Sequence, residues 1–430
     1  MKTRTINVET LARVEGEGAV RIKLRGQSIQ ELVLNIYEPP RLFEGFLRGR
    51  RYLEVPDITA RICGICPVAY QMSSVQAIER LLGVTVDPRV RDLRRLLYCG
   101  EWIESHALHI YLLHAPDFLG TQDAIQLAKV HPDIVKEGLR LKKIGNEIVR
   151  VVGGREIHPI NVRVGGFYRS PDPSEFDALK KDLEWAIDAS IRTIRWVATF
   201  PFPEFDRPYL FVALRHPEEY AITEGRIVAS DGMDIDVSEF ESNFIEEHVA
   251  HSNALHSVRK DGRSYFVGPL ARFNLNFGML TPLAREESEK AGLHGKCVNP
   301  FQSIIVRSVE MLYAFQEALR LVNAYQPPPF QEVTPRAGIG WGATEAPRGL
   351  LYHRYRIDER GSILDARIIP PTSQNQKSIE EDLREYVTKH HELPTDRLTL
   401  ECEQAIRNYD PCISCATHFV SLEKVDEHLS

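Results

Sequence analysis

This sequence is poor in cysteine and has no surplus of basic residues. Only 7 of its 430 residues are cysteines, an odd number that is too sparse for a disulfide scaffold. Lys and Arg number 53 against 60 Asp and Glu, so the formal net charge is −7. No positive surplus is left to neutralise a phosphate backbone. These shortages exclude a disulfide-stapled secreted fold and argue against a nucleic-acid partner.

The sequence also lacks a long apolar run and a targeting segment. No stretch approaches the ~20 apolar residues that a membrane-spanning helix needs. The first ten residues, MKTRTINVET, contain no apolar core of a signal peptide. Sparse cysteines that carry out metal or redox chemistry must stay reduced. We therefore expect a cytoplasmic protein with no membrane span.

Hydrophobic periodicity predicts a mostly helical α+β chain. Alternating apolar residues predict strands within residues 4–38, and spacing of three to four residues predicts a helix that begins at Pro67. Further helices are expected at about 90–114, 122–150, 174–200 and 300–325, and further strands at 208–213, 225–237 and 363–370. Residues 334–350, rich in Gly and Pro, predict a long irregular loop of the kind that is often functional. They contain no dinucleotide-binding glycine pattern.

Four of the cysteines form two CxxC pairs near opposite ends of the chain, Cys63–Cys66 and Cys412–Cys415. Pro67 follows the first pair, and Asp410 and Pro411 precede the second, which predicts a helix start at each pair. The positive end of a helix lowers the pKa of a thiol. Four thiolates suit zinc, an Fe–S cluster or another thiophilic metal. Spacing alone favours structural zinc, although zinc ribbons usually keep about 15–20 residues between pairs and these pairs lie 346 residues apart.

The residues around the pairs narrow this choice. The two motifs read Arg61-Ile-Cys-Gly-Ile-Cys66 and Asp410-Pro-Cys-Ile-Ser-Cys-Ala-Thr-His418. Supporting segments follow in order along the chain: Ala12–Gly16, Pro40–Gly49, Ser105–His109 with Asp117, Glu345–Gly349 and Pro371–Asn375. Together they resemble the large subunit of nickel–iron hydrogenases over nearly the whole chain. Length alone favours two or three domains. The resemblance instead implies one large domain over residues 1–418, with long helices and small peripheral sheets, a fold shared with the quinone-site subunit of complex I.

The resemblance implies a binuclear metal site. Cys63, Cys66, Cys412 and Cys415 would bind nickel, and the second cysteine of each pair would also bind an iron that carries carbon monoxide and cyanide. H2 would be cleaved heterolytically, with the Cys412 thiolate as first proton acceptor. Glu15 matches the glutamate that relays the proton outward. From composition alone, Glu15 is a surface glutamate between strands.

Other positions match residues placed around the metals. Arg348 matches an arginine held over the site, although as a loop arginine it could pair with Glu345. Asp117 and Asp410 match acidic residues that position this arginine by charge-assisted hydrogen bonds. Thr372 matches a hydroxyl that hydrogen-bonds cyanide. His106 and His109, one helical turn apart, are interpreted as core or supporting hydrogen-bonding residues rather than ligands.

A second metal is implied near the C-terminus. Glu44, His418 and a backbone carbonyl around Ile368 resemble the ligands of a divalent ion, usually magnesium. Carboxylate and carbonyl oxygens suit Mg²⁺, whereas imidazole does not, so another divalent ion is an alternative.

The chain has no second cysteine set for Fe–S clusters, so electrons must leave through a partner. The resemblance implies a small subunit with Fe–S clusters. The segment Cys66-Pro-Val-Ala-Tyr-Gln-Met-Ser-Ser74 resembles the cytoplasmic NAD(P)-linked hydrogenases, or sulfhydrogenases, which implies further Fe–S, flavin (FAD) and NAD(P) subunits. Precursors in this family are cut by a maturation endopeptidase after the last histidine of the motif, so residues 419–430 are expected to be removed. The rival interpretation is a noncatalytic scaffold, either complex I-like or held by structural zinc.

Overall fold

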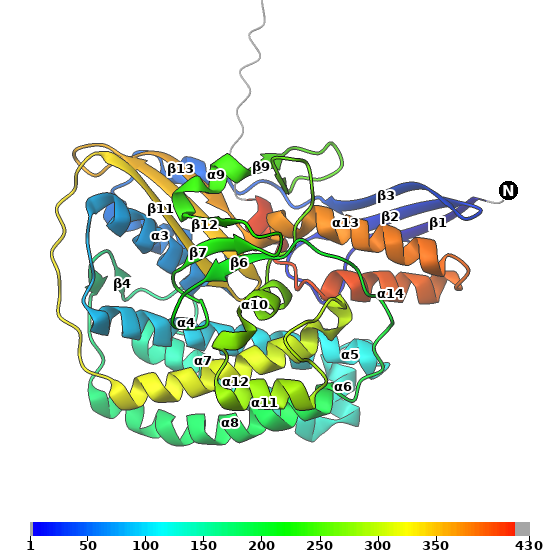
Figure 1. Cartoon of the computed structure of the whole chain (residues 1–430), viewed down its shortest axis with the longest axis horizontal. Coiled ribbons are helices and arrows are strands. Elements are labelled where there is room, and N and C mark those ends of the chain that lie inside the picture. Colours follow the sequence, from blue (N-terminus) through cyan, green and yellow to red (C-terminus); the bar gives the residue numbers. More distant parts are fainter. Residues whose placement is uncertain (1–2, 418–430) are drawn as a thin grey trace, which may run out of the picture.

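Long helices form one layer of the protein. The computed structural model describes residues 3–417. Its longest helices are α4 (Pro88–Leu108), α7 (Pro132–Gly153), α8 (Asp177–Val197) and α12 (Ser303–Ala324). In the lower half of Figure 1, α12 packs against α4 and α8, and α4 packs against α7. Their apolar faces, including Trp102, are fully buried, which confirms a mostly helical fold with a helical core.

The strands predicted within residues 4–38 form a three-stranded antiparallel sheet. Its strands are β1 (Thr3–Val8), β2 (Gly18–Arg25) and β3 (Ser28–Ile36), in the order β1-β2-β3. Alternate residues of β2 are buried, as the period of two requires. Helix α13 (Pro371–His390) packs against β3, so C-terminal helices lie beside the N-terminal sheet (Figure 1).

A second antiparallel sheet packs on helix α3 (Pro67–Leu82). Its strands are β11 (Gly338–Ala346), β12 (Gly349–Ile357) and β13 (Ile363–Ile369). The expectation of an irregular loop is therefore wrong from Gly338 onward. The glycines permit close packing: a Cβ at Gly340 would lie 2.0 Å from the carbonyl oxygen of Ala77 on α3. Only glycine lets the two backbones approach so closely.

Three helix predictions differ from the structure at their ends. The helix expected to 114 passes into a π-helical turn at His109–His114. The helix expected over 122–150 is two helices, α6 (Ala124–Val130) and α7, because Pro132 cannot continue a helix and starts a new one. No α-helix begins at Cys412, and the motif forms a 3₁₀ turn at Ile413–Thr417 instead.

Short elements complete the fold. They are α1 (Phe43–Leu47), α2 (Val55–Thr59), α5 (Ala115–Phe118), β4 (Val162–Arg163), β5 (Gly166–Phe167), β6 (Val212–Arg215), β7 (Arg226–Ala229), β8 (Asp234–Ile235), α9 (Phe240–Asn243), β9 (Phe244–Glu247), β10 (His256–Arg259), α10 (Pro269–Asn276), α11 (Pro282–Lys290) and α14 (Thr395–Arg407). The main hydrophobic core contains residues from Ile6 to Ala416, so both ends of the described chain pack into it. Within residues 3–417, no helix is long and apolar enough to cross a bilayer.

Candidate metal centre

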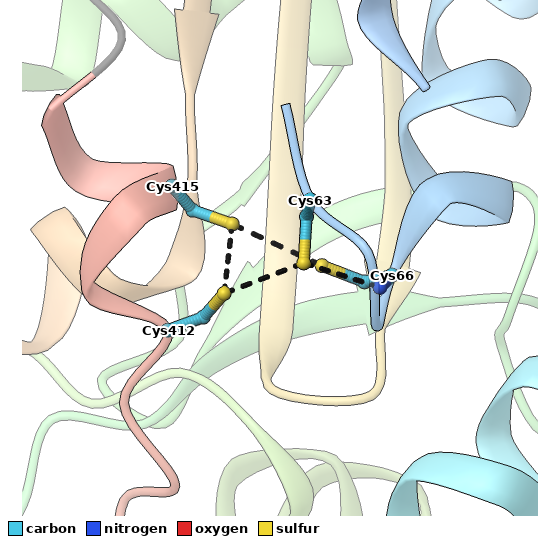
Figure 2. Close-up of side chains that lie close together, drawn as sticks. All are labelled: Cys63, Cys66, Cys412 and Cys415. Atoms are coloured by element: carbon cyan, nitrogen blue, oxygen red, sulfur yellow. Dashed lines mark hydrogen bonds between the residues drawn. The ribbon is translucent and has the colours of Figure 1, made fainter. Parts of the chain in front are cut away.

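The two cysteine pairs meet in the interior. Figure 2 shows their four sulfur atoms pointing toward one another, from the turn before α3 and from the C-terminal segment. The Sγ atoms of Cys63 and Cys412 are 3.4 Å apart, and those of Cys66 and Cys415 are 3.9 Å apart. All four side chains are buried. The Sγ atoms of Cys412 and Cys415 are closer, at 3.0 Å. All four lie within 4.8 Å of one another, near the ~3.8 Å that separates sulfur ligands of a four-coordinate metal.

The first pair is held by the start of α3. Cys66 is the residue before the helix and Pro67 is its first residue, as predicted. The backbone N–H groups of Ile65 and Cys66 donate to the sulfur of Cys63. The next free N–H groups, of Val68 and Ala69, donate to the buried carboxylate of Glu101. Glu101 therefore caps α3 beside the cysteines, a role that no local sequence signal reveals because Glu101 lies on α4.

The second pair is held by the N-terminal segment. The backbone N–H of Ile413 donates to the carbonyl oxygen of Glu15 at 2.9 Å. Thr372, at the start of α13, accepts a hydrogen bond from the N–H of Cys412 at 2.9 Å through its Oγ1. Residues from both chain ends thus position the same thiol.

The electrostatics of the cluster favour a bound cation. Hydrogen bonds with the sulfurs of Cys415 and Cys63, together with burial, raise the pKa of the Cys412 thiol well above its ordinary value. Four like charges in so small a buried volume would repel one another strongly. A metal ion removes this penalty and deprotonates coordinating thiols.

Arg348 lies beside the cluster, held by Asp410. Its Nε donates to the backbone carbonyl of Asp410 at 2.8 Å, and its Nη2 donates to the Asp410 carboxylate at 3.2 Å. Burial acts to lower the pKa of Arg348, but interactions with Asp410 and with the cysteines of the cluster outweigh it, so the guanidinium stays charged. Its buried Nη1 has no hydrogen-bond partner within residues 3–417. An acceptor group on a bound metal would fit this donor.

Asp410 sits in a strained position that suits this contact. Its φ is 51°, in the left-handed region that Asp tolerates better than most residues. His109 Nδ1 lies 3.2 Å from its Oδ1, which agrees with the interpretation of His109 as a supporting residue. His106 likewise contacts a buried carboxylate, that of Glu310, at 3.0 Å.

Glu15 contacts the cluster directly. Its Oε2 accepts a hydrogen bond from the Cys412 thiol at 3.0 Å and another from the N–H of Ser414 at 3.1 Å. The Ser414 hydroxyl donates to Oε2 of Glu38 at 3.0 Å. Glu15 and Glu38 are only half-buried, so this chain of polar groups leads from the sulfur toward solvent.

The structure corrects the expectation for Asp117. Its carboxylate does not hold Arg348 but accepts two 2.8 Å hydrogen bonds from Arg407, one to each oxygen, and a further bond from Arg13. The π-helical turn before α5 precedes Asp117, and two guanidinium groups already saturate its oxygens. Asp117 therefore anchors the N-terminal segment through Arg13 and the end of α14 through Arg407. These two arginines lie a few residues before Glu15 and Asp410 in the sequence.

The residues expected to bind the second metal lie partly together. The Glu44 side chain is buried, and its Oε1 accepts the N–H of Ile368 at 2.8 Å. His418, the third expected ligand, lies outside the described residues, as do positions 419–430.

Sequence reasoning missed a buried ionic network behind Arg348. Arg272 is fully buried and forms ion pairs with Glu310 and Glu345. Its guanidinium also donates to the carbonyl oxygens of Ala346 and Pro347, the two residues before Arg348. Arg272 thereby fixes the turn that presents Arg348.

A buried four-thiol centre, with a carboxylate on one sulfur and a paired arginine beside it, defines a thiophilic metal site. Comparisons with known proteins agree. The sequence model of the nickel-dependent hydrogenase family matches residues 41–136 and 302–418. The chain is 34% identical to sulfhydrogenase 1 subunit alpha of Pyrococcus furiosus over 425 residues, covering 97% of this chain and 98% of that protein.

Two further relatives extend the match. The NAD-reducing hydrogenase HoxS subunit beta of Cupriavidus necator is 29% identical, over 97% of this chain and 95% of that protein. The crystal structure of an NAD⁺-reducing [NiFe]-hydrogenase in the H2-reduced state superposes with a TM-score of 0.89 at 26% identity, over 96% of this chain and 99% of that one. The chain belongs to the nickel-dependent hydrogenase family and is its catalytic large subunit, with a four-cysteine nickel–iron site. The predicted resemblance and fold are confirmed, and the scaffold interpretation is set aside.

Proposed function

We propose that this hydrogenase subunit passes electrons from H2 through a small Fe–S subunit to NAD(P), by way of further flavin and Fe–S subunits. The NAD(P) linkage is supported by the NAD-reducing relatives. The individual residue roles are supported above all by one observation, the contact between the Cys412 sulfur and the Glu15 carboxylate.

Cys63, Cys66, Cys412 and Cys415 would hold the nickel–iron group, which with carbon monoxide and cyanide on its iron would supply the electrophilic centre for H2 cleavage. The chain supplies the proton acceptors. The Cys412 sulfur receives the proton, and Glu15 takes it across the 3.0 Å hydrogen bond. Glu15 is half-buried and can release the proton toward solvent, and Ser414 holds Glu15 through its backbone N–H and Glu38 through its hydroxyl. Glu15 is therefore the first carboxylate that receives the proton from Cys412.

Arg348, Asp410 and Thr372 organise the ligand side of the centre. The free Nη1 donor of Arg348 would bond an acceptor such as cyanide, and Asp410 fixes its orientation. Because the Thr372 hydroxyl oxygen accepts from the Cys412 N–H, its own hydrogen remains available to a second cyanide. These donors lie in a buried setting, where hydrogen bonds to an anion are strongest.

Electrons require a partner chain. Cys99, Cys297 and Cys402 are buried, and among the described residues the four-cysteine cluster is the only group of cysteines with metal-binding geometry. A small subunit with Fe–S clusters would therefore carry the electrons away.

Three further features complete the proposal. Glu44, the carbonyl of Ile368 and His418 would bind a divalent ion such as Mg²⁺, supported by the buried contact between Glu44 and Ile368.

Residues 1–418 would form one domain, supported by the shared core. A maturation endopeptidase would remove residues 419–430, and mass spectrometry of active enzyme should then find the C-terminus at His418. Activity with an intact Ser430 terminus would overturn that step.

Metal analysis and infrared spectroscopy of the purified complex test the centre. We expect about one nickel and one iron per chain at this site, and infrared bands of bound carbon monoxide and cyanide. Zinc in the four-cysteine site without those bands would refute the proposal. Reduction of NAD⁺ or NADP⁺ by H2, measured on the same complex, tests the acceptor separately.

A further inference from the structure

A second group of metal-binding side chains lies away from the four-cysteine centre. His251, His256 and Glu380 each offer one ligand atom, and these atoms all lie within 4.8 Å of one another. The three come from different places: the loop between β9 and β10, the first residue of β10, and the middle of α13. Nothing in the hydrogenase chemistry uses them.

Two of these residues are held in place by neighbouring backbone. Glu380 Oε1 accepts the N–H of Leu34 on β3 at 3.0 Å and His251 Nε2 lies 2.7 Å from the same oxygen. The loop that carries His251 is pinned to β3 because the N–H of Asn253 donates to the carbonyl of Ile36 at 2.7 Å. A carboxylate oriented by a backbone hydrogen bond is the usual arrangement around a metal ligand.

His256 provides the observation that points to a ligand. Its side chain belongs to a residue only 4% exposed, and its Nε2 has no hydrogen-bond partner within residues 3–417. A neutral imidazole is the form that binds a metal, and a buried ring nitrogen without a partner is otherwise costly.

We propose that His251, His256 and Glu380 bind a divalent transition-metal ion of the zinc class, with water completing the coordination. Two imidazoles and one carboxylate form a known zinc ligand set, with bonds of about 2.0–2.2 Å. Such bonds separate neighbouring ligand atoms by roughly 3.3 Å, so side-chain adjustments alone would bring the three atoms into place. His251 and Glu380 are both partly exposed, which gives an ion access from solvent.

The bound ion would tie the loop 248–255 to α13. This helix begins with Pro371 and Thr372, and Thr372 accepts the N–H of Cys412. The new site would therefore stabilise α13, the helix whose first turn contacts the Cys412 backbone. The alternative is a simple ion pair between His251 and Glu380, in which His256 takes no part.

Zinc binding by the assembled, nickel-loaded complex tests the proposal. The complex is incubated with zinc sulfate, passed through a desalting column and analysed for zinc. We expect the wild-type complex to retain one zinc per chain in addition to its nickel. Zinc binding should be at least about tenfold weaker in His256→Gln and Glu380→Gln. His294→Gln, a change at an exposed histidine elsewhere, is the matched control and should bind zinc normally.

Cobalt distinguishes this site from the cysteines. A Co²⁺ difference spectrum of the complex should show ligand-field bands without sulfur-to-cobalt charge transfer. His251→Gln alters a partly exposed loop residue and serves as the second variant should His256→Gln fold poorly. The proposal is overturned by wild-type complex that takes up no zinc, or by zinc that persists equally in His251→Gln and Glu380→Gln. Persistence in the His256 variant alone would favour the ion pair and also overturn it.

Discussion

Replacing Asp410 with Asn isolates the charge that holds Arg348. Asn has nearly the same shape and tolerates the left-handed φ of 51° as well as Asp does, so backbone strain is unchanged. The backbone carbonyl of residue 410 still accepts from Arg348 Nε. What is lost is the carboxylate charge facing Arg348 and His109.

The loss of stability should be near the lower end of the range for buried ion pairs. Removing one partner of such a pair costs about 3–5 kcal/mol, because the other charge stays buried and unpaired. Since one hydrogen bond to the backbone remains, we expect about 3 kcal/mol. For a chain of this length that corresponds to a fall in Tm of roughly 3–4 °C. Because Arg348 would also lose its orientation, we expect H2 oxidation to fall by roughly 10²-fold.

Thermal unfolding at a fixed scan rate and H2-dependent dye reduction measure the two effects at equal metal content. The control is Glu317→Gln, which removes a buried carboxylate of α12 that pairs with Arg95 of α4. The control should lose stability while keeping activity. The pKa of Asp410 is lowered in the folded protein, chiefly by Arg348 against the cost of burial, so its contribution is present above about pH 4 and lost below it. An Asp410→Asn protein with wild-type Tm and activity would refute the reasoning.

Four other changes test separate parts of the structure. Glu15→Gln keeps the hydrogen bond to Cys412 but cannot carry a proton, so H2 oxidation should fall roughly 10²–10⁴-fold while the infrared bands stay unchanged; normal turnover would refute the relay. Cys412→Ser should abolish H2 activity and nickel binding in a folded chain, as metal analysis and circular dichroism would show. Burial raises the pKa of Glu104 to about 7, so its folded form holds a proton that the unfolded form loses near pH 4.5. Stability from this group is then lost as pH rises from 4.5 to 7, and Glu104→Gln should remove up to about 3 kcal/mol of that decline in a Tm-against-pH series. Gly340→Ala places a Cβ 2.0 Å from the oxygen of Ala77 and should lower Tm by several degrees, whereas Gly278→Ala, where no atom lies within 4 Å and φ is not positive, should cost less.

The sequence predicted which residues lie at the site better than it predicted which side chains contact one another there. The CxxC pairs, Glu15 and Arg348 could be named because each lies in a recognisable local motif. The partners of Asp117 could not, because Arg13 and Arg407 lie 104 and 290 residues away from it. Glu101 is likewise invisible as a cap of α3, since it reaches the helix from 33 residues downstream. Long-range pairing depends on the fold, which local patterns do not encode.

The same limit explains the largest error in secondary structure. Glycine and proline near residues 334–350 predict a loop when only local propensity is considered. In the structure, Gly340 and Gly342 are required because β11 crosses α3 at backbone contact, and only a residue without Cβ fits there. Helices 67–82 and 303–324 were predicted well because their apolar spacing is a local signal, and burial of that apolar face stabilises them.

The distribution of the ligands along the chain links metal binding to the docking of the C-terminal segment. Cys415 lies on the 3₁₀ turn Ile413–Thr417 after α14, and Cys412 directly precedes this turn. The segment is held by Glu15, Thr372 and Arg348, which belong to three separate parts of the chain. This segment can dock only when those parts are already assembled. Docking then crowds four thiols together, which raises their free energy until a cation neutralises them. Metal binding and docking of the C-terminal segment therefore stabilise each other, because this segment carries two of the four cysteine ligands, Cys412 and Cys415.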